Sequence, residues 1–114
     1  LFYIYKIYIL IDKLYKYILQ LILILSNQNG MNKAAVFAEL IRSYEFISSW
    51  HHHELENTFK ELAAASQIKP GDVLLPLRIM LVGGKFGPGV FDIAEILGQR
   101  ETIARMEKTL SLLP

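Results

Sequence analysis

The residues with the clearest capacity to bind a ligand lie in a glycine-rich loop, GGKFGPG, at positions 83–89. Flexible backbone N–H groups, the cation of Lys85, the ring of Phe86 and a free helix N-terminus at Pro88 meet there. Arg78 lies about two helical turns earlier and adds a guanidinium group. Proteins hold unstacked RNA bases with such groups. A tight turn between two helices, in which the backbone alone requires glycine, explains the same residues equally well.

The loop does not match the phosphate-binding loop of nucleoside triphosphatases. In that motif the lysine is followed by serine or threonine, and the loop follows a strand. Here Lys85 is followed by Phe86, and the preceding segment shows no strand pattern. Binding of a nucleoside triphosphate at this loop is therefore excluded.

A run of three histidines, His51–His53, is followed by Glu54 and invites a metal interpretation. Adjacent helical residues point about 100° apart, so consecutive histidines in a helix do not converge on one ion. The chain has three histidines in total and no cysteine to complete a site. We expect a solvated helix start and no metal site. No serine is paired with a separate histidine and acid, so no catalytic residue is expected either.

Helical periodicity continues from residue 31 to the end of the chain. Apolar residues recur every three or four positions, and no segment shows the alternation of a strand. Asn32 is expected to cap the first helix, and Trp50 to pack at the entrance of the second. Pro76 either kinks the third helix or marks its true first turn, and Pro88 starts the fourth. The expected helices span residues 32–47, 51–66, 70–82, 89–97 and 101–113, which predicts an all-α bundle.

Composition and charge divide the chain near residue 30. A chain of 114 residues, 53% of them hydrophobic, suffices for one domain with one core. Residues 1–30 carry a formal charge of +2, and residues 31–114, with nine basic and ten acidic side chains, carry −1. RNA binding by the second part must therefore depend on a few placed contacts or on other domains. The absence of cysteine excludes disulfides.

Residues 1–30 form an apolar low-complexity extension that allows three interpretations. Its Leu, Ile, Tyr, Lys, Asn and Phe are typical of AT-rich DNA read in an arbitrary frame, so the segment is not necessarily native protein. It can instead be a helix at a membrane surface, since its longest charge-free apolar run, residues 17–25, is shorter than the about 20 residues of a spanning helix. The third interpretation is a helix packed in the core. A secretory signal is not expected, because no small-residue cleavage site follows.

Six motifs follow one another in register over residues 50–110. They are Trp50 with Leu55-Glu56, Lys69-Pro70-Gly71, Pro76-Leu77-Arg78, Gly83-Gly84, Gly87-Pro88-Gly89-Val90-Phe91 and Leu97-Gly98-Gln99-Arg100-Glu101. In this order they resemble the C-terminal anticodon-binding domain of bacterial glutamate–tRNA ligases, which are class I glutamyl-tRNA synthetases. Residues 32–48 are expected to extend the resemblance.

The resemblance implies an α-helical cage at residues 31–114 that approaches the anticodon bases of tRNA. It assigns Arg78 to base or phosphate oxygens, Gly87 to the binding loop, and Pro88 and Val90 to packing on splayed bases. Lys85 and Phe86 are added to this tRNA-binding set from their chemistry alone.

Three positions depart from the family pattern. His51 replaces the Ser or Thr usual at the helix cap, and such a loss costs about 1 kcal/mol. Gln99 and Arg100 differ from their family counterparts, which we interpret as a minor change.

The resemblance also implies a partner and a parent enzyme. The partners are the tRNA of glutamate and the rest of a cytoplasmic, monomeric ligase that joins glutamate to tRNA with ATP and Mg²⁺. The catalytic signatures of that family are not in this sequence, so the chain itself is expected to bind no cofactor and to catalyse nothing alone. Two alternatives stay open: a small membrane-associated helical interaction protein anchored by residues 1–25, and a free-standing tRNA-binding adaptor.

Overall fold

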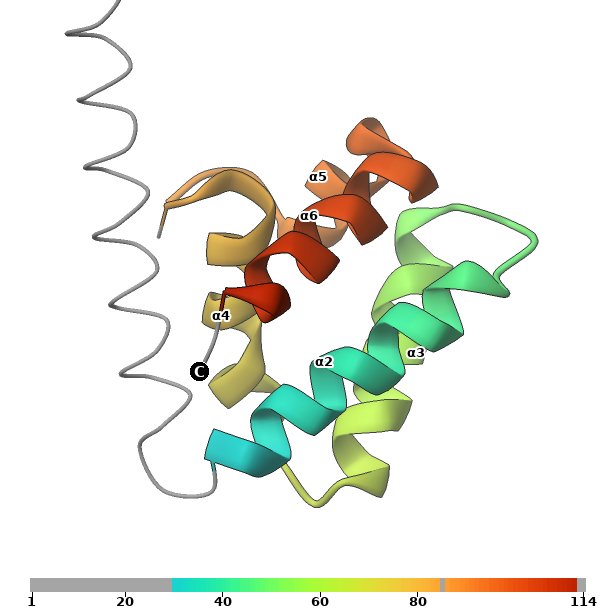
Figure 1. Cartoon of the computed structure of the whole chain (residues 1–114). Helices are drawn as coiled ribbons and strands as arrows, with labels where there is room; N and C mark the ends of the chain where they lie inside the picture. Colours follow the sequence, from blue (N-terminus) through green and yellow to red (C-terminus); the bar gives the residue numbers. More distant parts are fainter. Residues whose placement is uncertain (1–29, 85, 113–114) are drawn as a thin grey trace, which may run out of the picture.

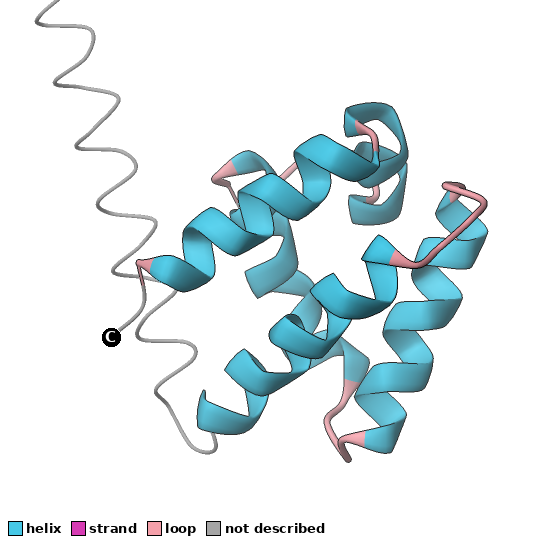
Figure 2. Ribbon diagram, turned by 45° about the vertical axis from the view of Figure 1, so that its right-hand side comes forward, coloured by secondary structure: helices cyan, strands magenta, loops and turns pink. Residues whose placement is uncertain are grey.

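The computed structural model describes residues 30–84 and 86–112, and within these ranges every regular element is an α-helix (Figure 2). The helices span Gly30–Glu45 (α2), His52–Ala65 (α3), Pro70–Val82 (α4), Val90–Leu97 (α5) and Gln99–Ser111 (α6). α2 lies against α3 and α6, while α4 and α5 pack on each other and on both α3 and α6 (Figure 1). The expected all-α bundle is confirmed for this part of the chain.

The core forms where the apolar stripes of the helices meet. Phe37, Leu40 and Tyr44 of α2 are completely buried, because residues spaced by three or four share one face of a helix. The apolar stripes of the other helices also face the core, although some of their residues are only half-buried, among them Leu62, Leu74, Ile103 and Leu110. Among the described residues, the other buried apolar side chains are Val36, Ile41, Leu55, Phe59, Ala63, Val73, Pro76, Leu77, Ile79, Met80, Leu81, Val90, Ala94 and Met106.

Two aromatic residues tie the connection between α2 and α3 to the rest of the bundle. The Tyr44 hydroxyl donates to the carbonyl oxygen of Leu55 at 2.9 Å, and burial raises the pKa of Tyr44, so the phenol stays protonated. Trp50 packs edge-on against Tyr44, with ring centroids 5.3 Å apart. The Trp50 indole N–H donates to the carbonyl oxygen of Ala94 in α5 at 2.9 Å. Trp50 thus precedes α3 as expected and also joins this connection to α5.

α5 and α6 meet at a single residue. Gly98 is both the C-terminal cap of α5 and the N-terminal cap of α6, with φ 87° and ψ 164°. This conformation is almost restricted to glycine, and it turns the chain within one residue. α6 therefore begins at Gln99, two residues before the expected start at Glu101.

The side chain of Gln99 closes the C-terminus of α2. Its Nε2 lies 2.7 Å from the carbonyl oxygen of Tyr44, 3.3 Å from that of Glu45 and 3.4 Å from that of Ile47. The last carbonyl groups of a helix lack partners within the helix, so a side-chain amide that reaches them stabilises the end. Gln99 therefore has a structural role, whereas the minor effect expected of its departure from the family pattern stays a prediction.

Replacing Gln99 with leucine is expected to lower the free energy of unfolding by about 1–2 kcal/mol, because leucine leaves these acceptors without a donor. Glutamate, of nearly the same shape, should destabilise at least as much, since its oxygens face other oxygens. Urea unfolding followed by circular dichroism measures both effects. Arg100→Leu, on the exposed neighbouring residue, should stay within about 0.5 kcal/mol of the parent chain. Equal losses at positions 99 and 100 would contradict the capping role.

Two expectations about helix ends need correction, for Asn32 and His51, and one of the two alternatives for Pro76 is excluded. α2 begins before Asn32, which lies inside the helix, because the preceding Met31 is a good helix former and extends it. Pro76 lies inside α4 and does not mark its first turn; its side chain is fully buried, and this packing offsets the backbone bond that proline removes. His51 does cap α3, since its Nδ1 accepts a hydrogen bond from the His53 backbone N–H at 3.4 Å. That bond is long, so the cap is weak.

None of the helices described here is long and apolar enough to cross a membrane. The three interpretations of the N-terminal extension all concern residues 1–30, of which residues 1–29 lie outside the described part of the chain. They stay predictions.

Candidate nucleic-acid interface

The loop between α4 and α5 is held against α4 by Arg78. The Arg78 Nη1 donates to the carbonyl oxygen of Pro88 at 2.6 Å, which joins two residues ten positions apart. A guanidinium carries five N–H donors in a planar fork, and this bond engages one of them. One half-buried side chain therefore shapes the loop and places a positive charge beside it.

Gly87 allows the loop to approach Arg78 this closely. Its backbone φ is +144°, a value that residues with a side chain rarely adopt. A Cβ atom at this position would lie 3.4 Å from the Arg78 Nη1. The backbone conformation therefore favours glycine, whereas a methyl group would meet the Arg78 Nη1 at about an ordinary contact distance. Pro88, the next residue, then presents its carbonyl oxygen to the guanidinium.

Two ring side chains of the loop are exposed. Phe86 is 91% exposed, and Pro88 is exposed as well. An aromatic ring close in sequence to a guanidinium contact is the arrangement that holds single-stranded bases by stacking and charge. Lys85, predicted to add a second cation, lies outside the described residues.

Val90 has a different position from the one that the resemblance implies. Its side chain is 4% exposed and belongs to the core, so it packs inward rather than against a splayed base. The cause is the start of α5: Gly89 is the N-cap and Pro88 lies outside the helix, so the first inward-facing position falls on Val90. The expected helix start at Pro88 is wrong for the same reason.

The N-terminus of α5 is covered by an acidic side chain that the sequence reading missed. The Asp92 Oδ2 would lie only 2.8 Å from a Cβ atom on Gly89, so the carboxylate lies over the first turn. A negative charge is favourable there because of the helix dipole. This end of α5 is therefore not the free helix N-terminus that we expected. An acidic residue three positions after a cap is a helix-start signal, and it could have located Asp92.

The α4 end of the loop is tied to α6 by Arg105. Its Nη1 donates to the carbonyl oxygen of Leu81 at 2.5 Å, and its Nε donates to Glu101 Oε1 at 2.8 Å. A cation at the C-terminus of a helix compensates the free carbonyl groups and the dipole. The loop is thus supported from two helices, at Arg78 and at Arg105.

Comparison with known proteins identifies the family of this helical unit. A family model described as an anticodon binding domain matches residues 15–110. The chain belongs to the anticodon-binding domain family. The match begins inside the N-terminal extension, and the expected boundary at residue 30 stays a prediction.

Several relatives that share this anticodon-binding domain are glutamate–tRNA ligases. The chain is 39% identical over 79 residues to the glutamate–tRNA ligase of Flavobacterium johnsoniae. This match covers 69% of this chain and 16% of that protein. It is 34% identical over 90 residues to glutamate–tRNA ligase 2 of Zymomonas mobilis. That match covers 79% of this chain and 18% of the ligase. These matches confirm the resemblance found in the motifs.

A solved structure has the same fold. The crystal structure of a glutamate tRNA ligase from Elizabethkingia meningosepticum, in complex with its amino acid, matches with a TM-score of 0.66 and 32% identity over 71% of this chain. The match covers 16% of that ligase. The anticodon-binding domain described here thus corresponds to a small part of the length of these relatives.

Proposed function

We propose that this anticodon-binding domain contacts a tRNA anticodon through the α4–α5 loop, as one part of a glutamate–tRNA ligase. The observation that carries the proposal is the bond from Arg78 to the Pro88 oxygen, which sets a guanidinium against the loop of exposed Phe86 in a chain of this family. The guanidinium would donate to base edges or phosphates, and the rings of Phe86 and Pro88 would offer stacking surfaces.

The charge of the domain supports a few placed contacts rather than broad attraction to phosphates. Residues 31–114 carry a formal charge of −1, and the carboxylate of Asp92 lies next to the loop. A protein that neutralises few phosphates releases few counterions, so its affinity for RNA should depend only weakly on salt. Stacking on Phe86 and donation by Arg78 would then supply most of the affinity.

The remaining features of the proposal concern the whole ligase. The tRNA is the glutamate isoacceptor, and the domain works as a monomer, in the cytoplasm, joined to the rest of the ligase chain. ATP and Mg²⁺ for aminoacylation bind elsewhere in that ligase. The domain itself contributes recognition of tRNA and no chemical step.

Replacing Arg78 with alanine is expected to weaken binding to a hairpin with the anticodon stem and loop of glutamate tRNA by about 1–3 kcal/mol, or about 5- to 150-fold. Phe86→Ala should cost about as much, because stacking is worth about 1–3 kcal/mol per base. Arg78→Lys keeps the charge but loses the planar fork. The affinity of this variant for the hairpin should therefore lie between that of the parent chain and that of Arg78→Ala. Fluorescence anisotropy with end-labelled RNA and the full chain measures these affinities.

Two matched variants control for charge and for apolar surface. Arg42→Ala removes the same charge from the exposed surface of α2, and Phe46→Ala removes another ring, 85% exposed, from the α2–α3 connection. Both should bind the hairpin like the parent chain, and circular dichroism should show the same helix content in all variants. Losses as large at Arg42 and Phe46 as at Arg78 and Phe86 would overturn the placement of the RNA on the α4–α5 loop.

A further inference from the structure

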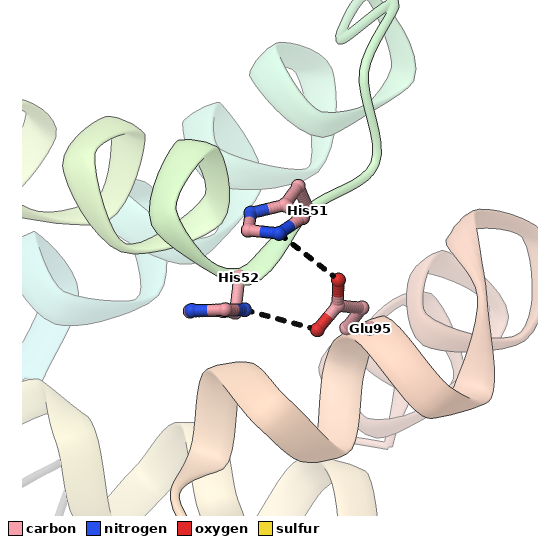
Figure 3. A group of neighbouring side chains, drawn as sticks. All are labelled: His51, His52 and Glu95. Atoms are coloured by element: carbon pink, nitrogen blue, oxygen red, sulfur yellow. Dashed lines mark hydrogen bonds and ion pairs between the residues drawn. The ribbon is translucent and has the colours of Figure 1, made fainter.

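The start of α3 lies against α5 through a cluster of two histidines and two carboxylates. The His52 Nδ1 lies 3.0 Å from the Glu95 Oε2, and the His51 Nε2 lies 3.6 Å from the Glu95 Oε1. Figure 3 shows both imidazole rings turned toward the same carboxylate. Asp92, one turn before Glu95 on α5, places its Oδ1 3.9 Å from the His52 Nδ1.

The reason for expecting no metal site at the histidines does not hold for this geometry. His51 is not a helical residue: it is the N-cap of α3, with extended dihedrals of φ −137° and ψ 146°. The angle of about 100° between adjacent helical side chains therefore does not separate His51 from His52. Glu95, the carboxylate that both histidines face, comes from α5, more than 40 positions later in the chain.

We propose that His51, His52 and Glu95 bind a divalent transition-metal ion of the Zn²⁺ type, which joins the N-terminus of α3 to α5. One donor atom from each residue lies within 4.8 Å of the other two. Tetrahedral Zn²⁺ with ligand bonds of about 2.0–2.1 Å holds neighbouring donors about 3.3 Å apart, so small side-chain rotations suffice. Two imidazoles and one carboxylate form a donor set that Zn²⁺ uses, with water or Asp92 as the fourth ligand.

Both histidines change tautomer when they bind a metal. The His52 Nδ1 lies 3.0 Å from the Glu95 Oε2, so the ring proton must be on Nε2 when Nδ1 binds a metal. The His51 Nδ1 accepts the capping bond from His53 in the free chain. Binding of a metal at Nε2 moves the ring proton to Nδ1, so this long bond is exchanged for the metal bond. The exchange gives up a weak contact.

Isothermal titration of the untagged full chain with Zn²⁺ at pH 7.5 tests the proposal. One ion per chain is expected, with a rise in the melting temperature, because an ion that binds the folded state preferentially stabilises it. His52→Ala and Glu95→Gln should each weaken Zn²⁺ binding at least about tenfold and remove most of this rise. Co²⁺ should give the visible absorption of a tetrahedral complex in the parent chain, and Mg²⁺ should not bind.

The third histidine of the run provides the matched control. His53 is exposed and does not belong to the cluster of mutually close ligand atoms. His53→Ala should therefore bind Zn²⁺ within about twofold of the parent chain, a change far below the tenfold expected of a ligand. The proposal is overturned if Glu95→Gln binds as tightly as the parent chain, or if His53→Ala loses as much as His52→Ala. Either result would mean that the histidine run binds the ion as an unstructured peptide would. RNA binding by the α4–α5 loop is measured separately.

Discussion

Replacing Phe59 with alanine is expected to lower the free energy of unfolding by about 3–5 kcal/mol. The side chain is 1% exposed on the inner face of α3 and meets the ring of Phe91 edge to face, with centroids 5.3 Å apart. Alanine removes the apolar area and leaves a cavity in a core that five short helices share. Because small domains have a total stability of about 5–15 kcal/mol, this single change consumes a large fraction of it.

The loss at Phe59 also bears on the proposed RNA surface, because Phe91 belongs to the first turn of α5, directly after the loop. Urea unfolding followed by Trp50 fluorescence and circular dichroism measures the loss. Phe59→Leu keeps most of the volume and should cost only about 1–1.5 kcal/mol, which gives a folded variant for comparison. Phe46→Ala should change stability by about 0.5 kcal/mol or less. If Phe59→Ala lowers the free energy of unfolding no more than Phe46→Ala does, the result would contradict the packing of α3 against α5.

Replacing Gly98 with alanine is expected to cost about 1–3 kcal/mol, although the added methyl group touches nothing. A Cβ atom at Gly98 meets no atom within 4 Å, so the loss comes only from the backbone, with φ at 87° and ψ at 164°. The residue caps two helices at once, so relaxing its dihedrals shifts the angle between α5 and α6.

Gly71→Ala is the matched control for Gly98→Ala. Gly71 also meets no atom within 4 Å, but it lies in the first turn of α4 with ordinary dihedrals. Alanine there should stabilise the chain by about 0.5–1 kcal/mol, because glycine loses more backbone freedom on folding. The two substitutions are thus expected to have opposite signs in thermal unfolding. Equal effects at the two glycines would show that the backbone at Gly98 is not the constraint.

The helices were predictable from the chain because helical periodicity is a local property. Apolar residues spaced by three and four mark the inner face of each helix. The stripe expected in the first helix is buried at Phe37, Leu40, Ile41 and Tyr44 and half-buried at Ile47. Glycine and proline mark the breaks, although helix starts shifted by up to two residues. The six motifs identified the family for the same reason, since their order along the chain requires no knowledge of contacts.

The candidate RNA loop was located by the same local signals, but the roles of its residues were not. The Arg78 side chain meets the Pro88 carbonyl oxygen beside Gly87, and their binding to RNA stays a proposal, whereas Val90 turns into the core. Which side of a short helix faces inward depends on where it starts, and the start depends on Gly89 and on the bond that Arg78 makes to Pro88. The residue at which α5 starts, and therefore the side that faces the core, cannot be predicted from composition alone.

The contacts between helices follow from packing, because their partners are far apart along the chain and meet only once the core has formed. Gln99 reaches the end of α2, Arg105 reaches the end of α4, and Glu95 reaches the histidines that precede and open α3. Each polar group is ordinary in the sequence and gains its role from the helix end that burial of the apolar stripes brings beside it. The apolar pattern and the order of the motifs along the chain thus specify the helices and the family. The contacts between helix ends, which only the tertiary structure brings together, specify the helix caps, the contacts that support the α4–α5 loop and the proposed metal ligands.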